Sequence, residues 1–269
     1  MLQTKAARKN FLLRMLPTYH NHEKTFDNGT NWNGRTHATR AFVFSVTMAN
    51  ILKEKGVKVD MNAVALATAG HDTGRRRNGR ETADSEKRSA ANTVAAVNEA
   101  YPGAAGPLWS AQIESNITTK AADQETIEGY LFKSADSLDY TRIDELDANH
   151  FPFLKEPIAT ADGFVLPTDP GIRRQLMKEA KLLTELTKPS YTLEAEHKQL
   201  IIELGPLPEG PARQAKTARK TALETQMAQR ETAQTENLTD AQIIDLVENA
   251  IRSRPQDFPL LTKYYLNAE

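Results

Sequence analysis

The sequence predicts an all-α protein, and three observations lead to this fold class. Apolar residues recur at three- and four-residue steps in several long stretches, which is the spacing of one helix face. Signals that start or end a helix bound many of these stretches, such as Asp169-Pro170 and Gly56. Runs in which polar and apolar residues alternate are scarce, and no internal repeat is present. We therefore expect a helical bundle with a C-terminal helical extension.

In the first half of the chain, helical patterns lie on both sides of a basic loop. Phe42, Val46 and the apolar residues up to Leu52 recur at helical spacing, which predicts a helix from 41 to 55. An alanine-rich helix then starts at residue 60 or 62 and leads to the pair His71-Asp72. The loop that follows carries the densest positive charge of the chain. After it, helices are expected at 83–100, 108–119 and 126–146.

The second half begins with an irregular stretch. Prolines and phenylalanines interrupt any pattern between 150 and 170, so a loop packed across the domain is expected. It is followed by helices at 172–186 and 193–204. Residues 212–237 have almost no large apolar side chain, so this segment is either a solvated helix or disordered. A last amphipathic helix at 239–251 can pack onto the body or onto a protein partner.

These patterns divide the chain into three parts. Residues 1–30 are an N-terminal segment, and residues 31–205 form the main domain. Residues 206–269 are a polar helical linker followed by a C-terminal helix. The boundary before this last part lies at the proline-rich stretch 206–211, where the helical spacing breaks.

Composition excludes several classes of protein. A chain of 269 residues can bury a sizeable core, and the absence of cysteine excludes disulfides and thiolate metal sites. The net charge of -1 provides no overall field that would attract duplex nucleic acid or an anionic membrane. No apolar run reaches the length of a membrane span or forms a signal-peptide core. We expect a cytoplasmic protein.

Two histidines and two aspartates are spaced as in a metal site. His71 and Asp72 are adjacent at the end of the alanine-rich helix, His37 lies in or just before the first turn of an earlier helix, and Asp136 lies within a later one. A buried imidazole beside a buried carboxylate is costly unless both are hydrogen-bonded or share a cation. The residues predicted to bind one divalent ion are therefore His37, His71, Asp72 and Asp136. A hydrogen-bonded polar core without metal is the alternative.

The order of these residues resembles the HD-domain superfamily of phosphohydrolases. The likeness includes the step Ser89-Ala90 and the last motif, Ala135-Asp136-x-Leu138-Asp139. Two stretches are most similar to the phosphodiesterase domain of the SidE bacterial effectors, namely Gly34-Arg35-x-His37-x-x-Arg40-Ala41 and His71-Asp72-x-Gly74-Arg75-x-x-x-Gly79. The resemblance covers about residues 31–189. It implies an HD-type helical bundle in which metal-activated water cleaves a phosphoester or pyrophosphate bond.

The SidE resemblance also implies a different mechanism. SidE phosphodiesterases work without a metal, so that His37 would attack phosphorus with help from Glu86, on an ADP-ribosylated protein such as ubiquitin. The chain departs from both family patterns. Ser85 stands where two-metal HD enzymes carry a further histidine, which implies a single metal. Lys133 and Ser134 stand where SidE-like enzymes use a second catalytic histidine, which speaks against the covalent mechanism.

Arginines cluster around both motif stretches and are expected to bind substrate phosphate. Guanidinium groups stay charged and bind phosphate oxygens bidentately. The candidates are Arg35, Arg40, Arg75, Arg80 and Arg88, and Arg40 is also expected to take part in catalysis with His37, His71, Asp72 and Glu86. Glu86 could protonate the leaving oxygen or orient a water molecule. Asp139 or a backbone carbonyl is expected to hold the second ring nitrogen of a ligand histidine.

Three functions follow from these patterns. The first is a metal-dependent HD-type phosphohydrolase or phosphodiesterase acting on a nucleotide or nucleotide-modified substrate. The second is the SidE-like reaction without metal, in a bacterial effector delivered into a host cell without a recognisable signal peptide. The third is a non-catalytic nucleotide-binding module with a C-terminal helix that contacts a protein partner. None of the three requires a membrane or a nucleic-acid duplex.

Overall fold

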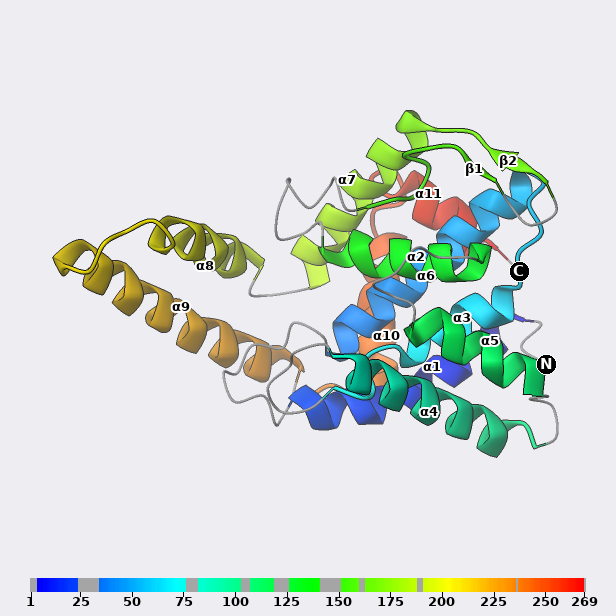
Figure 1. Cartoon of the computed structure of the whole chain (residues 1–269), viewed down its shortest axis with the longest axis horizontal. Coiled ribbons are helices and arrows are strands. Elements are labelled where there is room, and N and C mark those ends of the chain that lie inside the picture. Colours follow the sequence, from blue (N-terminus) through cyan, green and yellow to red (C-terminus); the bar gives the residue numbers. More distant parts are fainter. Residues whose placement is uncertain are drawn as a thin grey trace.

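In the computed structural model, the residues described are 4–23, 34–75, 82–102, 107–118, 126–140, 151–159, 163–187, 191–235 and 237–268. Over these ranges the protein is a bundle of helices, and the predicted all-α class is confirmed (Figure 1). The described strands are a two-residue antiparallel pair, Ile158–Ala159 (β1) and Val165–Leu166 (β2). Every described helix is too short or too polar to cross a lipid bilayer.

Three helices form the centre of the bundle: α2 (Arg35–Glu54), α3 (Met61–Gly70) and α6 (Ile127–Tyr140). All three pack against one another. Other elements cover α2 along almost its whole length, which suits a helix with apolar residues on more than one face. In α3, small side chains are buried from Ala63 to Gly70, so neighbouring helices approach closely.

The helix α1 (Lys5–Glu23) packs against α3 and α2 and so belongs to the same core. It lies within the stretch 1–30 that was expected as a separate segment, and the sequence prediction omits it. Its apolar spacing is nevertheless helical, because the buried side chains recur at three- and four-residue steps: Phe11, Leu12, Met15, Leu16 and Tyr19.

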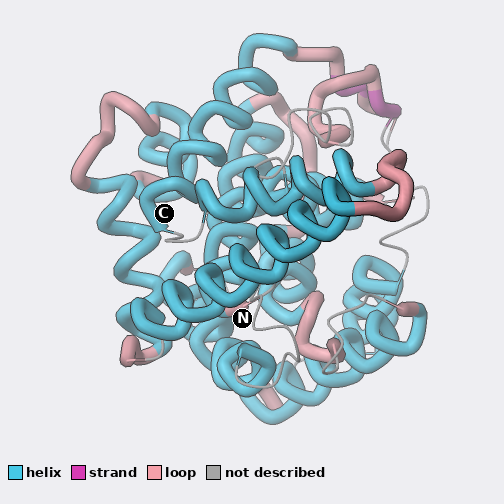
Figure 2. Tube along the Cα trace, turned by 90° about the vertical axis from the view of Figure 1, so that its left-hand side faces the viewer, coloured by secondary structure: helices cyan, strands magenta, loops and turns pink. Residues whose placement is uncertain are grey.

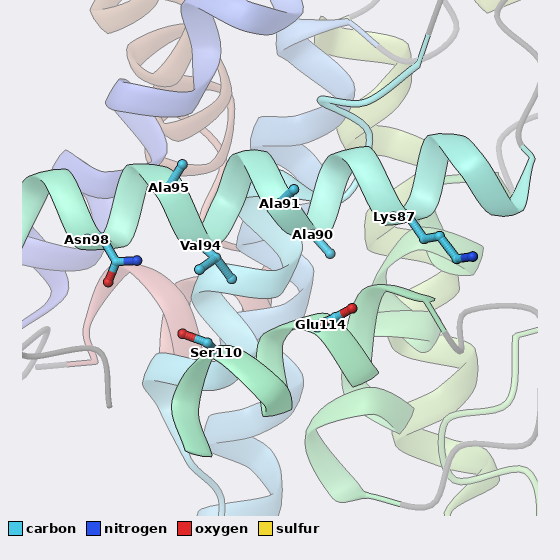
Figure 3. A pocket seen from close by; sticks show the side chains of 8 residues that line it. All are labelled: Lys87, Ala90, Ala91, Val94, Ala95, Asn98, Ser110 and Glu114. Carbon is cyan, nitrogen blue, oxygen red and sulfur yellow. The ribbon is translucent and has the colours of Figure 1, made fainter. Parts of the chain in front are cut away.

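The helices α4 (Ala83–Ala100) and α5 (Pro107–Thr118) pack against each other and against α3. Thr82 begins α4 with a capping box in which Ser85 takes the reciprocal position. Between α4 and α5 lies a groove of about 360 Å³ (Figure 3), lined by Lys87, Ala90, Ala91, Val94, Ala95, Asn98, Ser110 and Glu114. None of the predicted site residues lines this groove.

Two further helices, α8 (Tyr191–Leu204) and α9 (Pro211–Thr235), form an antiparallel hairpin that projects from the bundle after α7 (Pro170–Thr187) (Figure 1). Of the two alternatives for residues 212–237, the solvated helix is therefore correct up to Thr235. Figure 2 views the molecule from the hairpin side and shows how little of the described chain is not helical.

The chain then returns to the bundle through α10 (Asp240–Arg252), α11 (Pro259–Leu261) and a final turn, η2 (Thr262–Leu266). All of these pack on α2, and α10 and α11 also pack on α7. The expected boundary at 205/206 thus falls in the turn of the α8–α9 hairpin, while the elements after the hairpin complete the core. The predicted continuation of α6 to residue 146 lies outside the described residues.

Candidate metal centre

Four buried side chains meet at one point of the bundle. His37 comes from the first turn of α2, His71 and Asp72 from the turn that follows α3, and Asp136 from α6. One possible ligand atom of each lies within 4.8 Å of those of the other three. The predicted meeting of these four residues is therefore confirmed, and together they could hold a metal ion.

A tight turn places His71 and Asp72. The helix α3 ends at Gly70, and the backbone N–H of Thr73 then donates to the Gly70 carbonyl at 3.1 Å. A Cβ atom at Gly70 would lie 1.8 Å from Oγ1 of Thr93, and one at Gly74 would lie 2.2 Å from the carbonyl oxygen of Ser85. Only glycine at both positions lets α4 pack directly on this turn.

Each histidine uses its Nδ1 atom for a hydrogen bond directed away from the centre. His71 Nδ1 lies 2.7 Å from the carbonyl oxygen of Thr68, and His37 Nδ1 lies 2.6 Å from Oδ2 of Asp139. A carbonyl accepts and cannot donate, and an ionised carboxylate only accepts, so both Nδ1 atoms carry the proton. In the neutral rings the two Nε2 lone pairs therefore face each other, at a distance of 3.1 Å.

The two carboxylates add oxygen atoms to the same point. Oδ1 of Asp136 lies 3.4 Å from His37 Nε2 and 3.3 Å from His71 Nε2. Oδ2 of Asp72 lies 3.5 Å and 3.4 Å from the same two nitrogens. Four acceptor atoms gathered in a buried space repel one another unless a cation or protons lie between them. This arrangement of donors to a metal fits a divalent ion.

Protons can take the place of a cation in this centre. Burial lowers the pKa of His71, but the carboxylates of Asp72 and Asp136 outweigh it and raise the pKa to about 9. Burial also lowers the pKa of His37, and hydrogen bonds to Asp136, Asp139 and Asp72 outweigh it, so that this pKa is raised as well. Both directions reflect the negative charge of the surrounding carboxylates, which favours the protonated imidazoles as it would favour a bound cation.

The carboxylate of Asp139 joins His37 to Arg40. Nε of Arg40 donates to Oδ1 of Asp139 at 2.6 Å, and Nη2 donates to Oδ2 at 3.1 Å. Nη1 of Arg40 donates to the hydroxyl of Thr187 at 3.2 Å. The expected partnership of Asp139 with a ligand histidine is confirmed. Arg40 was expected to bind phosphate, but it is fully buried and its guanidinium group contacts Asp139. It is therefore placed to hold Asp139 against His37.

Three other predicted arginines also contact the protein around the centre. Arg75 Nε lies 2.8 Å from Oδ1 of Asp72, so this guanidinium group lies beside a candidate ligand. Arg88 donates through Nε to the Gly74 carbonyl at 2.9 Å and holds the turn. Arg35 is buried and donates through Nη1 to the carbonyl of Leu238 and to Asp240, which ties the start of α2 to the start of α10. Arg80 lies outside the described residues.

The remaining candidates lie on α4 and α6. Glu86 is half-buried in the first turn of α4 and is not one of the four residues that meet. Ser85 is buried in the capping box of the same helix. Lys133 is half-buried on α6, one turn before Asp136, and Ser134 is buried beside it in sequence.

Two aromatic residues complete the walls of the centre, and sequence reasoning misses both. The backbone N–H of Asp72 donates to the hydroxyl of Tyr19 at 3.2 Å, and the ring centroids of Tyr19 and His71 are 6.4 Å apart. The ring centroid of Phe132 lies 5.5 Å from that of His71. The helical spacing of α1 and the position of Phe132 one turn before Asp136 are the sequence signals that could have indicated them.

The chemistry of the centre depends on its own donor atoms. Two imidazole nitrogens and two carboxylate oxygens form a mixed set that suits divalent first-row transition metals, because imidazole and carboxylate are both ligands for these ions. Solvent reaches the cluster mainly at Asp136, whose side chain is 7% exposed, while the other three side chains are at most 1% exposed.

Comparison of the chain with protein-family models, with curated proteins and with solved structures found no match.

Proposed function

We propose that the protein is a metal-dependent phosphohydrolase or phosphodiesterase of the HD type. Its substrate would be a nucleotide or a nucleotide-modified molecule, cleaved at a phosphoester or pyrophosphate bond. The observation that supports this function best is the meeting of four acceptor atoms from His37, His71, Asp72 and Asp136 in one buried space. The order of these residues resembles that of HD phosphohydrolases, in which such a set binds a catalytic ion.

In this proposal, His37, His71, Asp72 and Asp136 hold one divalent ion. A divalent ion supplies Lewis acidity toward a phosphoryl oxygen and an attacking water. Arg75 keeps Asp72 oriented and adds a positive charge close to the centre. Because Asp136 is the most exposed of the four, substrate and water approach from its side of the cluster. Lys133, one turn before Asp136 on α6, is the candidate for phosphate binding, and Glu86 on α4 is the candidate for proton transfer.

A specific observation keeps the SidE-like reaction as a second candidate. The carboxylate of Asp139 accepts from His37 Nδ1 and directs the Nε2 lone pair inward, which is also what a nucleophilic histidine requires. His71 Nε2 lies 3.1 Å from that atom, in the space that a phosphorus atom would need. The metal-dependent reaction is therefore the better supported of the two.

The function is tested with the purified full chain and with His71→Ala, Asp136→Ala and His197→Ala. His197 is a matched control, because it is a buried histidine that pairs with Glu224 in the α8–α9 hairpin. We expect about one divalent ion per chain in the wild type and in His197→Ala, by elemental analysis, and loss of the ion from the other two variants with helical circular dichroism retained. A panel of nucleotides, phosphodiesters and ADP-ribosylated ubiquitin then identifies the substrate class.

Different outcomes separate the candidate functions. Hydrolysis that chelation stops and divalent ions restore supports the proposal. AMP release from ADP-ribosylated ubiquitin that persists after complete chelation would replace it with the SidE-like reaction. Tight nucleotide binding without turnover would favour the non-catalytic module. Retention of the ion by His71→Ala would contradict the site itself.

A further inference from the structure

A buried ion pair lies one helical turn from the candidate metal centre. Arg40 and Asp139 are both inaccessible to solvent, and two hydrogen bonds join them, at 2.6 and 3.1 Å. A buried ion pair costs desolvation energy that only good geometry and further hydrogen bonds offset. The bidentate contact provides that geometry, and Oδ2 of Asp139 accepts a third hydrogen bond, from His37 Nδ1 at 2.6 Å.

Helix periodicity arranges these residues in two layers. Arg40 follows His37 by three residues on α2, and Asp139 follows Asp136 by three residues on α6. Positions three apart lie one turn from each other on the same face of a helix. His37 and Asp136 therefore form a ligand layer, and Arg40 and Asp139 form a supporting layer one turn further along both helices.

A third helix anchors the supporting layer. The hydroxyl of Thr187, near the end of α7, accepts from Nη1 of Arg40 at 3.2 Å and donates to the carbonyl of Leu183 at 2.7 Å. Thr187 is fully buried as well. The guanidinium group is thus held from α6 and from α7, and its planar fork fixes the direction in which Asp139 presents Oδ2 to His37.

We propose that Asp139 and Arg40 are positioning residues: they hold the Nδ1–H tautomer of His37 and so set how tightly the centre binds its ion. Arg40 neutralises the charge of Asp139, which lets the carboxylate stay ionised and accept the Nδ1 proton. The Nε2 lone pair then points into the centre, where it can bind a cation. The part of this inference that concerns the ion rests on the proposed function, whereas the part that concerns the tautomer does not.

The other histidine offers an internal control. His71 Nδ1 is held by the carbonyl of Thr68, three residues earlier, and needs no side chain for its tautomer. A change at Asp139 or Arg40 should therefore alter the tautomer of His37 and leave that of His71 as it is. A general loosening of the core would alter both.

The test uses the full chain labelled with ¹⁵N at histidine, with resonances assigned through single histidine substitutions. The variants are Asp139→Asn, Arg40→Met and Arg40→Lys. The control is Glu248→Gln, because Glu248 is another buried carboxylate with charged partners, Lys9 and Arg252, in a different part of the core. Histidine nitrogen shifts report each tautomer, and titration with Mn²⁺ or Zn²⁺ gives the dissociation constant.

In the wild type, at a pH high enough for both histidine rings to be neutral, we expect His37 in the Nδ1–H form. In Asp139→Asn and Arg40→Met we expect a mixture of forms for His37, no change for His71, and an ion affinity weakened by about 10- to 100-fold. Arg40→Lys should restore part of the affinity, because an ammonium group keeps the charge but loses the fork. Glu248→Gln should leave both the tautomers and the affinity unchanged.

Wild-type tautomer and affinity in both Asp139→Asn and Arg40→Met would overturn the proposal. Equal changes at His37 and His71 would also overturn it, since they would indicate a purely structural role. If the wild type binds no ion but Asp139→Asn still shifts the His37 tautomer, the proposed function fails and the positioning role holds. If Asp139→Asn does not fold, Arg40→Lys and Thr187→Val give the same readouts, with smaller expected shifts.

Discussion

At the scale of single residues, burial and charge act on the two central histidines in opposite directions. Burial alone would lower each pKa, yet the surrounding carboxylates raise both, that of His71 to about 9. In the ion-free protein near neutral pH, a proton on the His71 imidazole therefore offsets part of the negative charge of Asp72 and Asp136. Because a divalent ion in the proposed site would need the same Nε2 atoms, protons and the ion would compete for the centre.

This competition predicts a pH-dependent ion affinity. Between about pH 6.5, the usual histidine pKa, and pH 9, the dissociation constant should fall by up to about tenfold per pH unit for each proton displaced. Chelator-competition titrations with Zn²⁺ at several pH values measure it. A dissociation constant that is independent of pH over this range would contradict the assignment of the histidines as ligands.

The raised histidine pKa values also predict that the ion-free fold becomes less stable as pH rises, whereas ion binding becomes tighter. A histidine whose pKa is raised on folding contributes stability that is complete below its unfolded pKa and is lost as pH rises through its folded pKa. The melting temperature of the ion-free protein should therefore fall as pH rises from about 6.5 toward 9. Calorimetry of the ion-free and the ion-loaded chain measures this, and saturating ion should remove the fall. If the melting temperature depended on pH equally in the ion-free and the ion-loaded protein, this result would count against the site.

At the scale of elements, the centre depends on how closely α4 packs against the turn after α3. Among the described glycines, Gly74 lies closest to backbone atoms of another element. A Cβ at Gly74 would lie 2.2 Å from the Ser85 carbonyl oxygen and 2.4 Å from the Ser89 amide nitrogen. The Gly74 N–H also donates to the hydroxyl of Ser89 at 2.8 Å, and Arg88 donates to the Gly74 carbonyl. A displaced α4 would shift the backbone that carries His71 and Asp72.

We therefore expect Gly74→Ala to lower the free energy of unfolding by about 1–3 kcal/mol and to weaken ion binding as well. Urea denaturation and ion titration measure the two effects. Gly205→Ala is the matched control, since its nearest heavy atom would be the Ile202 carbonyl oxygen at 3.5 Å, an ordinary contact. The control should change stability by no more than about 0.5 kcal/mol. Similar losses for both variants would show that packing at Gly74 is not special.

At the scale of the whole molecule, the two ends of the chain close the bundle and the hairpin extends from it. Lys9 of α1 pairs with Glu248 of α10 at 3.0 Å, and Lys5 donates to the carbonyls of Tyr265 and Leu266 in η2. The α8–α9 hairpin is held instead by surface ion pairs such as Arg219 with Glu196. Leu223 is its one described large aliphatic side chain that is fully buried.

Surface ion pairs contribute little stability, so the hairpin should open more easily than the body. We expect backbone amides in α8 and α9 to exchange hydrogen faster than those in α2, α3 and α6, by at least about tenfold. Hydrogen exchange with mass spectrometry of the full chain measures this difference. Equal protection of the hairpin and the central helices would indicate that something else holds the hairpin, such as a second copy of the chain.

The sequence by itself determined most of the helical segments, though not α1, and which four residues meet. Helical periodicity is a local property, so the spacing of apolar residues predicts α2, α3, α4 and α10 within a few residues of their observed ends, except that α2 begins earlier, at Arg35. The four ligand candidates were predictable because a motif of polar residues next to apolar helical stretches restricts where they can lie. The ion and the reaction stay predictions.

Apart from Asp139, only the tertiary structure decided which partners surround those four residues. The partners of Arg40 and Arg35 could not be assigned from sequence, because a guanidinium group binds a phosphate and a carboxylate equally well. The carboxylates that they contact, Asp139 and Asp240, lie on helices distant in sequence. Tyr19 likewise contacts Asp72 from a helix, α1, that is distant in sequence. Pairing across elements depends on packing of the whole chain, which local spacing does not encode.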